Sequence, residues 1–163
     1  MRPFTACILS LTCVLGACAS PRETSGADLV LSTSLLKAPM QDTSGRPLVL
    51  ADVLASNETV ALVFWQAWCA PCRAEAPALV SASRQHPEME IVGVVSGPDE
   101  AVDGEALQDA IHDLGLPYRT VRDRSLELTE ALDVRGTPTI VVLDKNGRVL
   151  YQGHEVPDWE TLR

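Results

Sequence analysis

Cysteine is scarce over most of this sequence. The 163 residues contain five cysteines, and three of them lie within the first 18 positions, which leaves only Cys69 and Cys72 in the rest of the chain. So few thiols exclude a small domain that is held together by several disulfides. The N-terminal group and the later pair therefore point to two separate chemistries.

Basic residues are also in the minority. The chain has 13 Lys and Arg residues against 22 Asp and Glu residues, and its net charge is −9 at pH 7. Such a chain is repelled by a phosphate backbone, so we expect no nucleic-acid partner. With 46% hydrophobic and 21% charged residues, the length and composition suit one domain with a packed core.

Long apolar runs are absent after the N-terminus, where Arg2 precedes an uncharged stretch over residues 4–17. That stretch is shorter than the roughly 20 residues of a transmembrane helix but suits a signal peptide. Its end, Leu15-Gly16-Ala17-Cys18, resembles a bacterial lipobox, in which the cysteine thiol receives the lipid. We therefore predict a lipoprotein signal peptide over residues 1–17. The alternative is ordinary cleavage after Ala19, which releases a soluble periplasmic or secreted protein.

These signals set the expected domain limits and location. A lipidated Cys18 and a polar, flexible tether occupy residues 18–28, and a single domain follows over residues 29–163. The lipid places the protein on the periplasmic side of the cell envelope. Because Ala19 rather than Asp follows Cys18, sorting to the outer membrane is slightly favoured in a Gram-negative host.

Apolar runs alternate with helical patterns after the tether. We predict strands at 60–65, 91–95, 139–143 and 148–151, and helices at 71–85, 104–114 and 125–132. Asn146-Gly147 predicts a hairpin between the last two strands, and residues 45–50 predict a short hairpin near the N-terminus. The pattern indicates an α/β class with a central mixed sheet, helices on its flanks and an N-terminal β-hairpin extension.

Trp68-Cys69-Ala70-Pro71-Cys72 lies where the first buried strand ends and a helix begins. Free N–H groups and a partial positive charge at a helix N-terminus stabilise a thiolate, so we expect a lowered pKa for the Cys69 thiol. Cys69, at the helix start, is expected to be the more exposed thiol and the attacking one. Cys72, one turn later, is expected to resolve the mixed disulfide.

Two other interpretations of the cysteine pair stay open at this point. One is an inert structural disulfide. The other is half of a zinc site, but zinc takes about four ligands, and the sequence holds no second CxxC pair. The three histidines, His86, His112 and His154, are isolated in the sequence and have no ligand spacing. We expect them on the surface, and we expect neither a metal nor another cofactor.

Several segments resemble, in the same order, the thioredoxin superfamily and in particular its TlpA/ResA group of membrane-tethered, extracytoplasmic thiol–disulfide oxidoreductases. The matching segments are residues 64–77 (FWQAWCAPCRAEAP), 91–95 (IVGVV), 134–139 (VRGTPT) and the Asn146-Gly147 hairpin. They cover essentially residues 29–151. The resemblance implies a thioredoxin-like fold.

The resemblance also implies roles for single residues. Thr137 and Pro138 match a cis-proline loop beside the cysteines, in which the backbone of Thr137 pairs with the substrate chain. Trp68 matches the substrate-facing surface. Val63 stands where cytoplasmic thioredoxins have a buried aspartate that takes up a proton. Glu75 matches a family glutamate and is the acid nearest to the cysteines in sequence. Assistance in proton transfer is one interpretation of Glu75, and a surface or structural role is its alternative.

The predicted function is that of an extracytoplasmic disulfide reductase. Its implied partners are protein disulfides, with apocytochrome c as one candidate, and a membrane thiol carrier of the DsbD/CcdA type. A thiol peroxidase is an alternative, although Leu62 and Gln66 stand where the peroxiredoxin motif has Pro and Thr. A non-catalytic envelope binding module with a structural disulfide is the third possibility.

Overall fold

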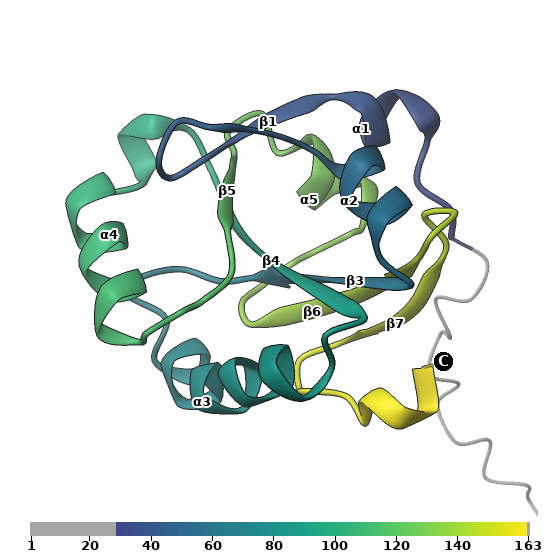
Figure 1. Cartoon of the computed structure of the whole chain (residues 1–163). Coiled ribbons are helices and arrows are strands. Elements are labelled where there is room, and N and C mark those ends of the chain that lie inside the picture. Colours follow the sequence, from purple (N-terminus) through teal and green to yellow (C-terminus); the bar gives the residue numbers. More distant parts are fainter. Residues whose placement is uncertain (1–28, 163) are drawn as a thin grey trace, which may run out of the picture.

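The computed structural model describes residues 29–162 (Figure 1). The predicted signal peptide, the Cys18 lipidation site and the tether lie outside the described residues. The elements follow one another as α1 (Thr33–Lys37), β1 (Pro39–Asp42), β2 (Pro47–Val49), α2 (Leu50–Ser56), β3 (Thr59–Phe64), α3 (Ala70–Gln85), β4 (Met89–Ser96), η2 (Asp99–Ala101), α4 (Gly104–Asp113), β5 (Thr120–Asp123), α5 (Glu127–Ala131), β6 (Thr139–Asp144), β7 (Val149–Gly153) and η3 (Trp159–Leu162). Within residues 29–162, no helix combines the length and apolar character needed to cross a bilayer.

Seven strands form one mixed sheet in the order β2-β1-β5-β4-β3-β6-β7. Strand β4 runs parallel to β3 and β5, and the other neighbours pair antiparallel. The β1-β2 hairpin extends the sheet beyond β5, where the buried Asp42 carboxylate accepts hydrogen bonds from Arg46 and Arg119. This arrangement confirms the predicted α/β class with its N-terminal hairpin.

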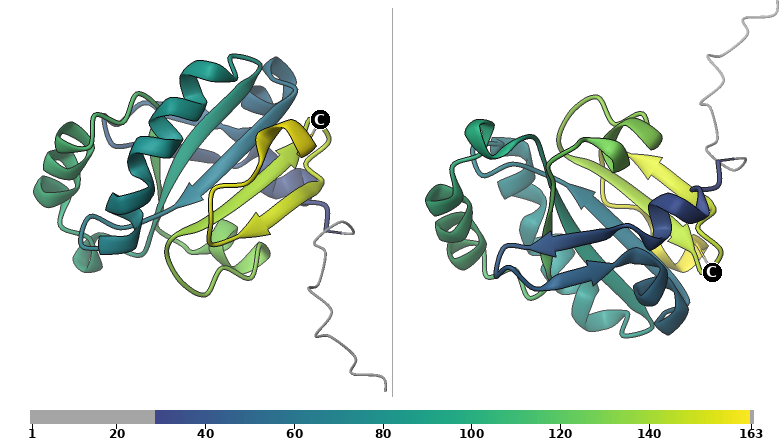
Figure 2. Two further views of the ribbon diagram at one scale, coloured as in Figure 1. Left: turned by 90° about the horizontal axis from the view of Figure 1, so that it is seen from below. Right: turned by 90° about the horizontal axis from the view of Figure 1, so that it is seen from above.

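Helices cover both faces of the sheet (Figures 1 and 2). Helices α1, α2 and α5 lie on one face, α3 and η3 lie on the other, and α4 stands at the β5 side. Alternate residues of β3 serve the two faces, since Leu62 and Phe64 pack toward α2 and α5 whereas Ala61 and Val63 pack toward α3. Burial on both faces explains why the central strands have continuous apolar sequences.

The predicted strands and helices are confirmed with small shifts at their ends, but several short elements were not predicted. They are the helices α1 and α2, the 3-10 helix η2 and strand β5. Residues 48–50 were expected to form one strand, yet Leu50 begins α2 instead. Strand β5 escaped prediction because three of its four residues are polar. Arg122 and Asp123 are nevertheless buried, each held by hydrogen bonds.

Candidate active site

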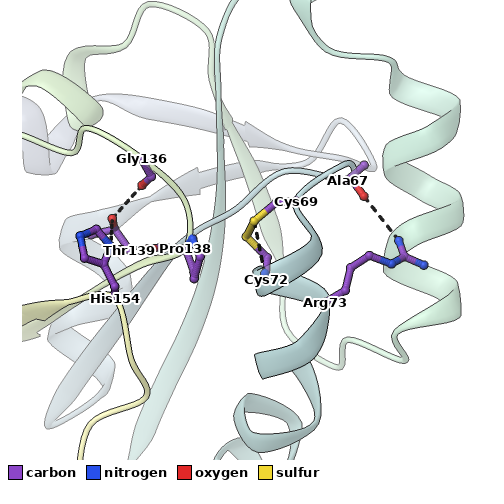
Figure 3. The surroundings of a disulfide bond; sticks show 8 residues. All are labelled: Ala67, Cys69, Cys72, Arg73, Gly136, Pro138, Thr139 and His154. Carbon is purple, nitrogen blue, oxygen red and sulfur yellow. Dashed lines mark hydrogen bonds between the residues drawn. A yellow bond between two sulfur atoms is a disulfide. The ribbon is translucent and has the colours of Figure 1, made fainter.

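Cys69 and Cys72 form a disulfide at the start of α3 (Figure 3). Their Cα atoms lie 5.3 Å apart. Cys69 is the N-cap of the helix, and the backbone N–H of Cys72 donates to the Cys69 Sγ atom at 3.2 Å. Pro71, within the first turn, needs no hydrogen-bond partner for its nitrogen. The Cys69 sulfur therefore occupies the position where a helix N-terminus stabilises negative charge.

The expectation that Cys69 is the more exposed cysteine is wrong for this disulfide form. Cys69 is 2% exposed and Cys72 is 6% exposed. The reason is the N-cap conformation of Cys69, which turns its side chain back over the first turn of α3. There Cys69 packs in one cluster with Trp65 and with Leu107 of α4.

The two tryptophans beside the cysteines differ in exposure. Trp65 is 3% exposed and belongs to the core, whereas Trp68 is 78% exposed. A groove of about 460 Å³ adjoins Trp68, and its lining includes Arg73, the α4 N-cap Asp103, and Asp109 and Asp113 of α4. The loop keeps its shape in part because the Arg73 guanidinium donates to the Ala67 carbonyl at 3.4 Å.

Residues 136–139, which we call the proline loop, lead into β6, and Pro138 of this loop faces the disulfide (Figure 3). The Thr137–Pro138 peptide bond is cis. The Thr139 hydroxyl donates to the Gly136 carbonyl at 2.7 Å, and the Nδ1 atom of His154 lies 2.7 Å from the Pro138 carbonyl oxygen. The fold thus brings Pro138, with Thr137 bonded to it, to the side of Cys72. The predicted contact of Thr137 and Pro138 with substrate stays a prediction.

Glu75 lies one turn after Cys72, and both residues line a small cavity. The cavity has room of about 10 Å³, and Pro138, Val63 and Tyr118 also line it. The Oε2 atom of Glu75 is buried and has no hydrogen-bond partner among residues 29–162. Glu75 therefore reaches the region of Val63, the position at which cytoplasmic thioredoxins have their aspartate.

Burial raises the pKa of Glu75 above its ordinary value of 4.5. The negative charge of Glu155 raises this pKa further, and His154 opposes the shift. Burial likewise raises the pKa of the Tyr118 phenol, so Tyr118 stays neutral beside the carboxyl group. A carboxyl group that holds its proton to higher pH is suited to exchange a proton with a thiol.

The histidines lie in separate parts of the structure. His86 is near Glu88 at the end of α3, and His112 is exposed on α4. His154 contacts the proline loop, which the sequence did not suggest, because only the fold brings the end of β7 to Pro138. Over residues 29–162, no three His, Cys, Asp or Glu side chains are arranged to hold a metal ion.

The chain is similar to several proteins of known name. It matches the family model described as Redoxin over residues 28–162. It is 27% identical over 151 residues to the thiol-disulfide oxidoreductase ResA of Bacillus subtilis, covering 90% of this chain and 80% of that protein. It is 30% identical over 116 residues to a thioredoxin-like protein of Haemophilus influenzae, covering 71% of this chain and 66% of that protein. It is also 34% identical to the thiol:disulfide interchange protein HelX of Rhodobacter capsulatus over 88 residues, which is 53% of this chain and 47% of HelX.

Solved structures show the same fold. The chain superimposes with a TM-score of 0.64 on a secreted Mycobacterium tuberculosis disulfide oxidoreductase homologous to Escherichia coli DsbE, at 23% identity, covering 78% of this chain and 89% of that one. With M. tuberculosis DsbF the TM-score is 0.66 at 22% identity, covering 82% and 96%. The fold is thioredoxin-like. The chain belongs to the Redoxin family, as a thioredoxin-like thiol–disulfide oxidoreductase similar to ResA, with Cys69 and Cys72 as its CxxC pair.

Proposed function

We propose that this protein is an extracytoplasmic disulfide reductase. The observation that carries the proposal is the Cys69 sulfur at the N-terminus of α3, where it accepts the Cys72 N–H. In the reduced protein the same N–H and the positive end of the helix favour a Cys69 thiolate. A stabilised thiolate at a position next to an exposed Trp68 and the proline loop is suited to attack a protein disulfide.

The reaction proceeds in two exchanges. The Cys69 thiolate attacks one sulfur of the substrate disulfide, a Cys69–substrate mixed disulfide forms, and the other substrate sulfur leaves as a thiolate. The Cys72 thiolate then attacks the Cys69 sulfur, which releases the second substrate thiolate. Two electrons pass to the substrate, and the protein ends with the Cys69–Cys72 disulfide.

Glu75 is proposed to take up the proton of the Cys72 thiol. Its Oε2 atom, which finds no hydrogen-bond partner in the described part of the chain, belongs to a side chain that shares a cavity with Cys72. The cavity volume is about what one water molecule needs to relay a proton. The raised pKa of Glu75 moves this carboxyl group closer to neutral pH, where a general base is most efficient. Trp68 and the backbone of Thr137 are proposed to bind the substrate chain.

The cellular setting is proposed from the sequence and from the relatives. A lipid on Cys18 holds the domain at the periplasmic side of the envelope, with the outer membrane slightly favoured in a Gram-negative host. The similarity to ResA and HelX supports apocytochrome c thiols as a candidate substrate. A dithiol that reduces others must itself be reduced again, so the proposal includes a membrane thiol carrier of the DsbD/CcdA type.

Reduction of insulin disulfides in the presence of dithiothreitol tests the proposal. The wild-type protein should accelerate insulin reduction, and Cys69→Ser should return the rate to that of dithiothreitol alone. Turnover of hydrogen peroxide instead would support the peroxidase alternative. If neither substrate reacts, or if insulin reduction survives Cys69→Ser, the proposal is overturned, and the binding module with a structural disulfide is favoured.

A further inference from the structure

The proline loop has one face toward the disulfide and another held by side chains. Pro138 lines the small cavity together with Cys72. Because proline has no N–H group, the carbonyl is the only backbone hydrogen-bonding group of Pro138. That carbonyl oxygen lies 2.7 Å from the Nδ1 atom of His154, on the side of the loop away from the disulfide (Figure 3).

The direction of this hydrogen bond is fixed by its chemistry. A carbonyl oxygen only accepts, so the Nδ1 atom of His154 must carry the proton. The Thr139 hydroxyl lies farther from Nδ1, at 3.5 Å, and donates to the Gly136 carbonyl at 2.7 Å. Two carbonyls of the loop, those of Gly136 and Pro138, are therefore occupied by side-chain donors.

The turn that contains His154 is stabilised by a hydrogen bond of its own. The Tyr151 hydroxyl donates to the Glu155 carbonyl at 2.8 Å and closes the turn around His154. Gly153 makes this possible, because a Cβ atom there would collide with the Tyr151 hydroxyl. The Gln152 side chain donates to the Leu132 carbonyl at 2.7 Å, which ties β7 to the segment that leads into the proline loop. His154 is thus held in place from two directions.

We propose that His154 is a positioning residue, whose Nδ1–H group holds the Pro138 carbonyl and so fixes the Thr137 backbone that receives an extended substrate chain. This inference rests on the proposed function, since it assumes exchange with a protein disulfide. It goes beyond that function by making one histidine responsible for how well the protein distinguishes peptide substrates from small disulfides. A loop that is held in its binding conformation avoids the entropic cost of ordering when substrate binds.

Two variants with the same branching at Cγ separate the hydrogen bond from packing. His154→Asn keeps an N–H donor at the position of Nδ1, and His154→Leu keeps a similar shape without a donor. His112→Leu is the matched control, because the His112 side chain is 93% exposed on α4. Each variant is assayed with insulin and with 5,5′-dithiobis(2-nitrobenzoate), an aromatic disulfide that has no peptide backbone to pair with Thr137.

His154→Leu should lower kcat/KM for insulin about fivefold, as expected for one net hydrogen bond, while His154→Asn and His112→Leu stay within about twofold of wild type. All variants should reduce the aromatic disulfide within about twofold of the wild-type rate, because no backbone pairing is involved. The inference is overturned if His154→Leu keeps full insulin turnover, if it loses both substrates in parallel, or if Asn fails to rescue. A wild-type protein that is inactive toward insulin overturns the proposed function instead.

Discussion

The two sulfur atoms of the Cys69–Cys72 disulfide lie in different surroundings. The Cys69 sulfur accepts a backbone N–H at the positive end of α3. Cys72 borders a small cavity that Glu75 also lines, and the buried Oε2 atom of Glu75 has no hydrogen-bond partner within the described residues. The helix N-terminus therefore stabilises negative charge on Cys69, whereas Cys72 has a proton acceptor nearby. The comparison shows that two chemically identical side chains, one helical turn apart, can have separate roles because their surroundings differ.

Replacing each cysteine in turn tests this asymmetry most strongly. Cys69→Ser should abolish insulin reduction, because the stabilised thiolate is lost. Cys72→Ala should also stop turnover but should accumulate mixed disulfides through Cys69, because nothing resolves them. Non-reducing gels and intact mass spectrometry, after incubation of the reduced variants with a disulfide peptide, would show the adducts. Adducts formed by Cys69→Ser rather than by Cys72→Ala would reverse the proposed roles.

Glu75→Gln should affect only the second exchange. Loss of a general base costs about 100-fold or more in the step that it serves, so the mixed disulfide should persist while the first attack keeps its rate. Rapid quenching of single turnovers, followed by mass spectrometry, separates the two steps. Glu75→Asp keeps a carboxyl group and should restore part of the rate. A Glu75→Gln variant that resolves its mixed disulfide at the wild-type rate would leave the cavity without a catalytic role.

The sequence predicted those parts of the site whose residues are neighbours in the chain. The CxxC pair, the strand before it and the helix after it are adjacent in the chain, so the pattern alone indicated their positions. The exposure of Cys69 was predicted wrongly, because its side chain turns back over the start of α3 into a cluster that also holds Leu107 of α4, which lies far along the chain. His154 was missed for the same reason, since its contact with Pro138 exists only after β6 and β7 pair.

The strands likewise divide into those with a clear sequence pattern, which were predicted, and one without it, which was not. Strands with continuous apolar runs, such as β3 and β4, were predicted because burial on both faces leaves a clear sequence pattern. Strand β5 left no such pattern. The Asp123 carboxylate there accepts from the backbone N–H and hydroxyl of Thr129, so this buried acid is satisfied by the first turn of α5. The apolar pattern predicts that helix but does not reveal the contact.

The two tryptophans beside the cysteines also differ in their expected roles, since Trp65 contributes to stability and Trp68 to substrate binding. Trp65→Ala should lower the free energy of unfolding by roughly 3–5 kcal/mol, because it removes a buried aromatic side chain. Trp68→Ala should change that free energy by less than about 0.5 kcal/mol, since Trp68 is exposed. It should instead raise KM for insulin by about fivefold, the size of an ordinary contact at a binding surface. Chemical denaturation and steady-state kinetics measure the two effects, and an unchanged KM would remove Trp68 from the substrate surface.

The smallest expected effect is a pH dependence of stability in the disulfide form. Burial and the charge of Glu155 raise the pKa of Glu75 in the folded protein above its ordinary value of 4.5. Below that value both the folded and the unfolded states hold the proton, so Glu75 contributes no difference. Above it the unfolded state loses the proton first, and the free energy of unfolding falls until the pH passes the raised pKa.

Glu75→Gln lacks this loss, so wild type should become less stable relative to the variant as the pH rises through that interval, and the gap should then stay constant. Denaturation at a series of pH values measures the gap. Glu155→Gln is the matched control, because it removes one of the causes of the raised pKa and keeps the Glu75 carboxyl group. Its loss of stability should therefore end at a lower pH than that of wild type. A gap between wild type and Glu75→Gln that does not change with pH would mean that Glu75 ionises as readily in the fold as in the unfolded chain. The Cys72 environment would then lack the carboxyl group of raised pKa that distinguishes it from the Cys69 environment.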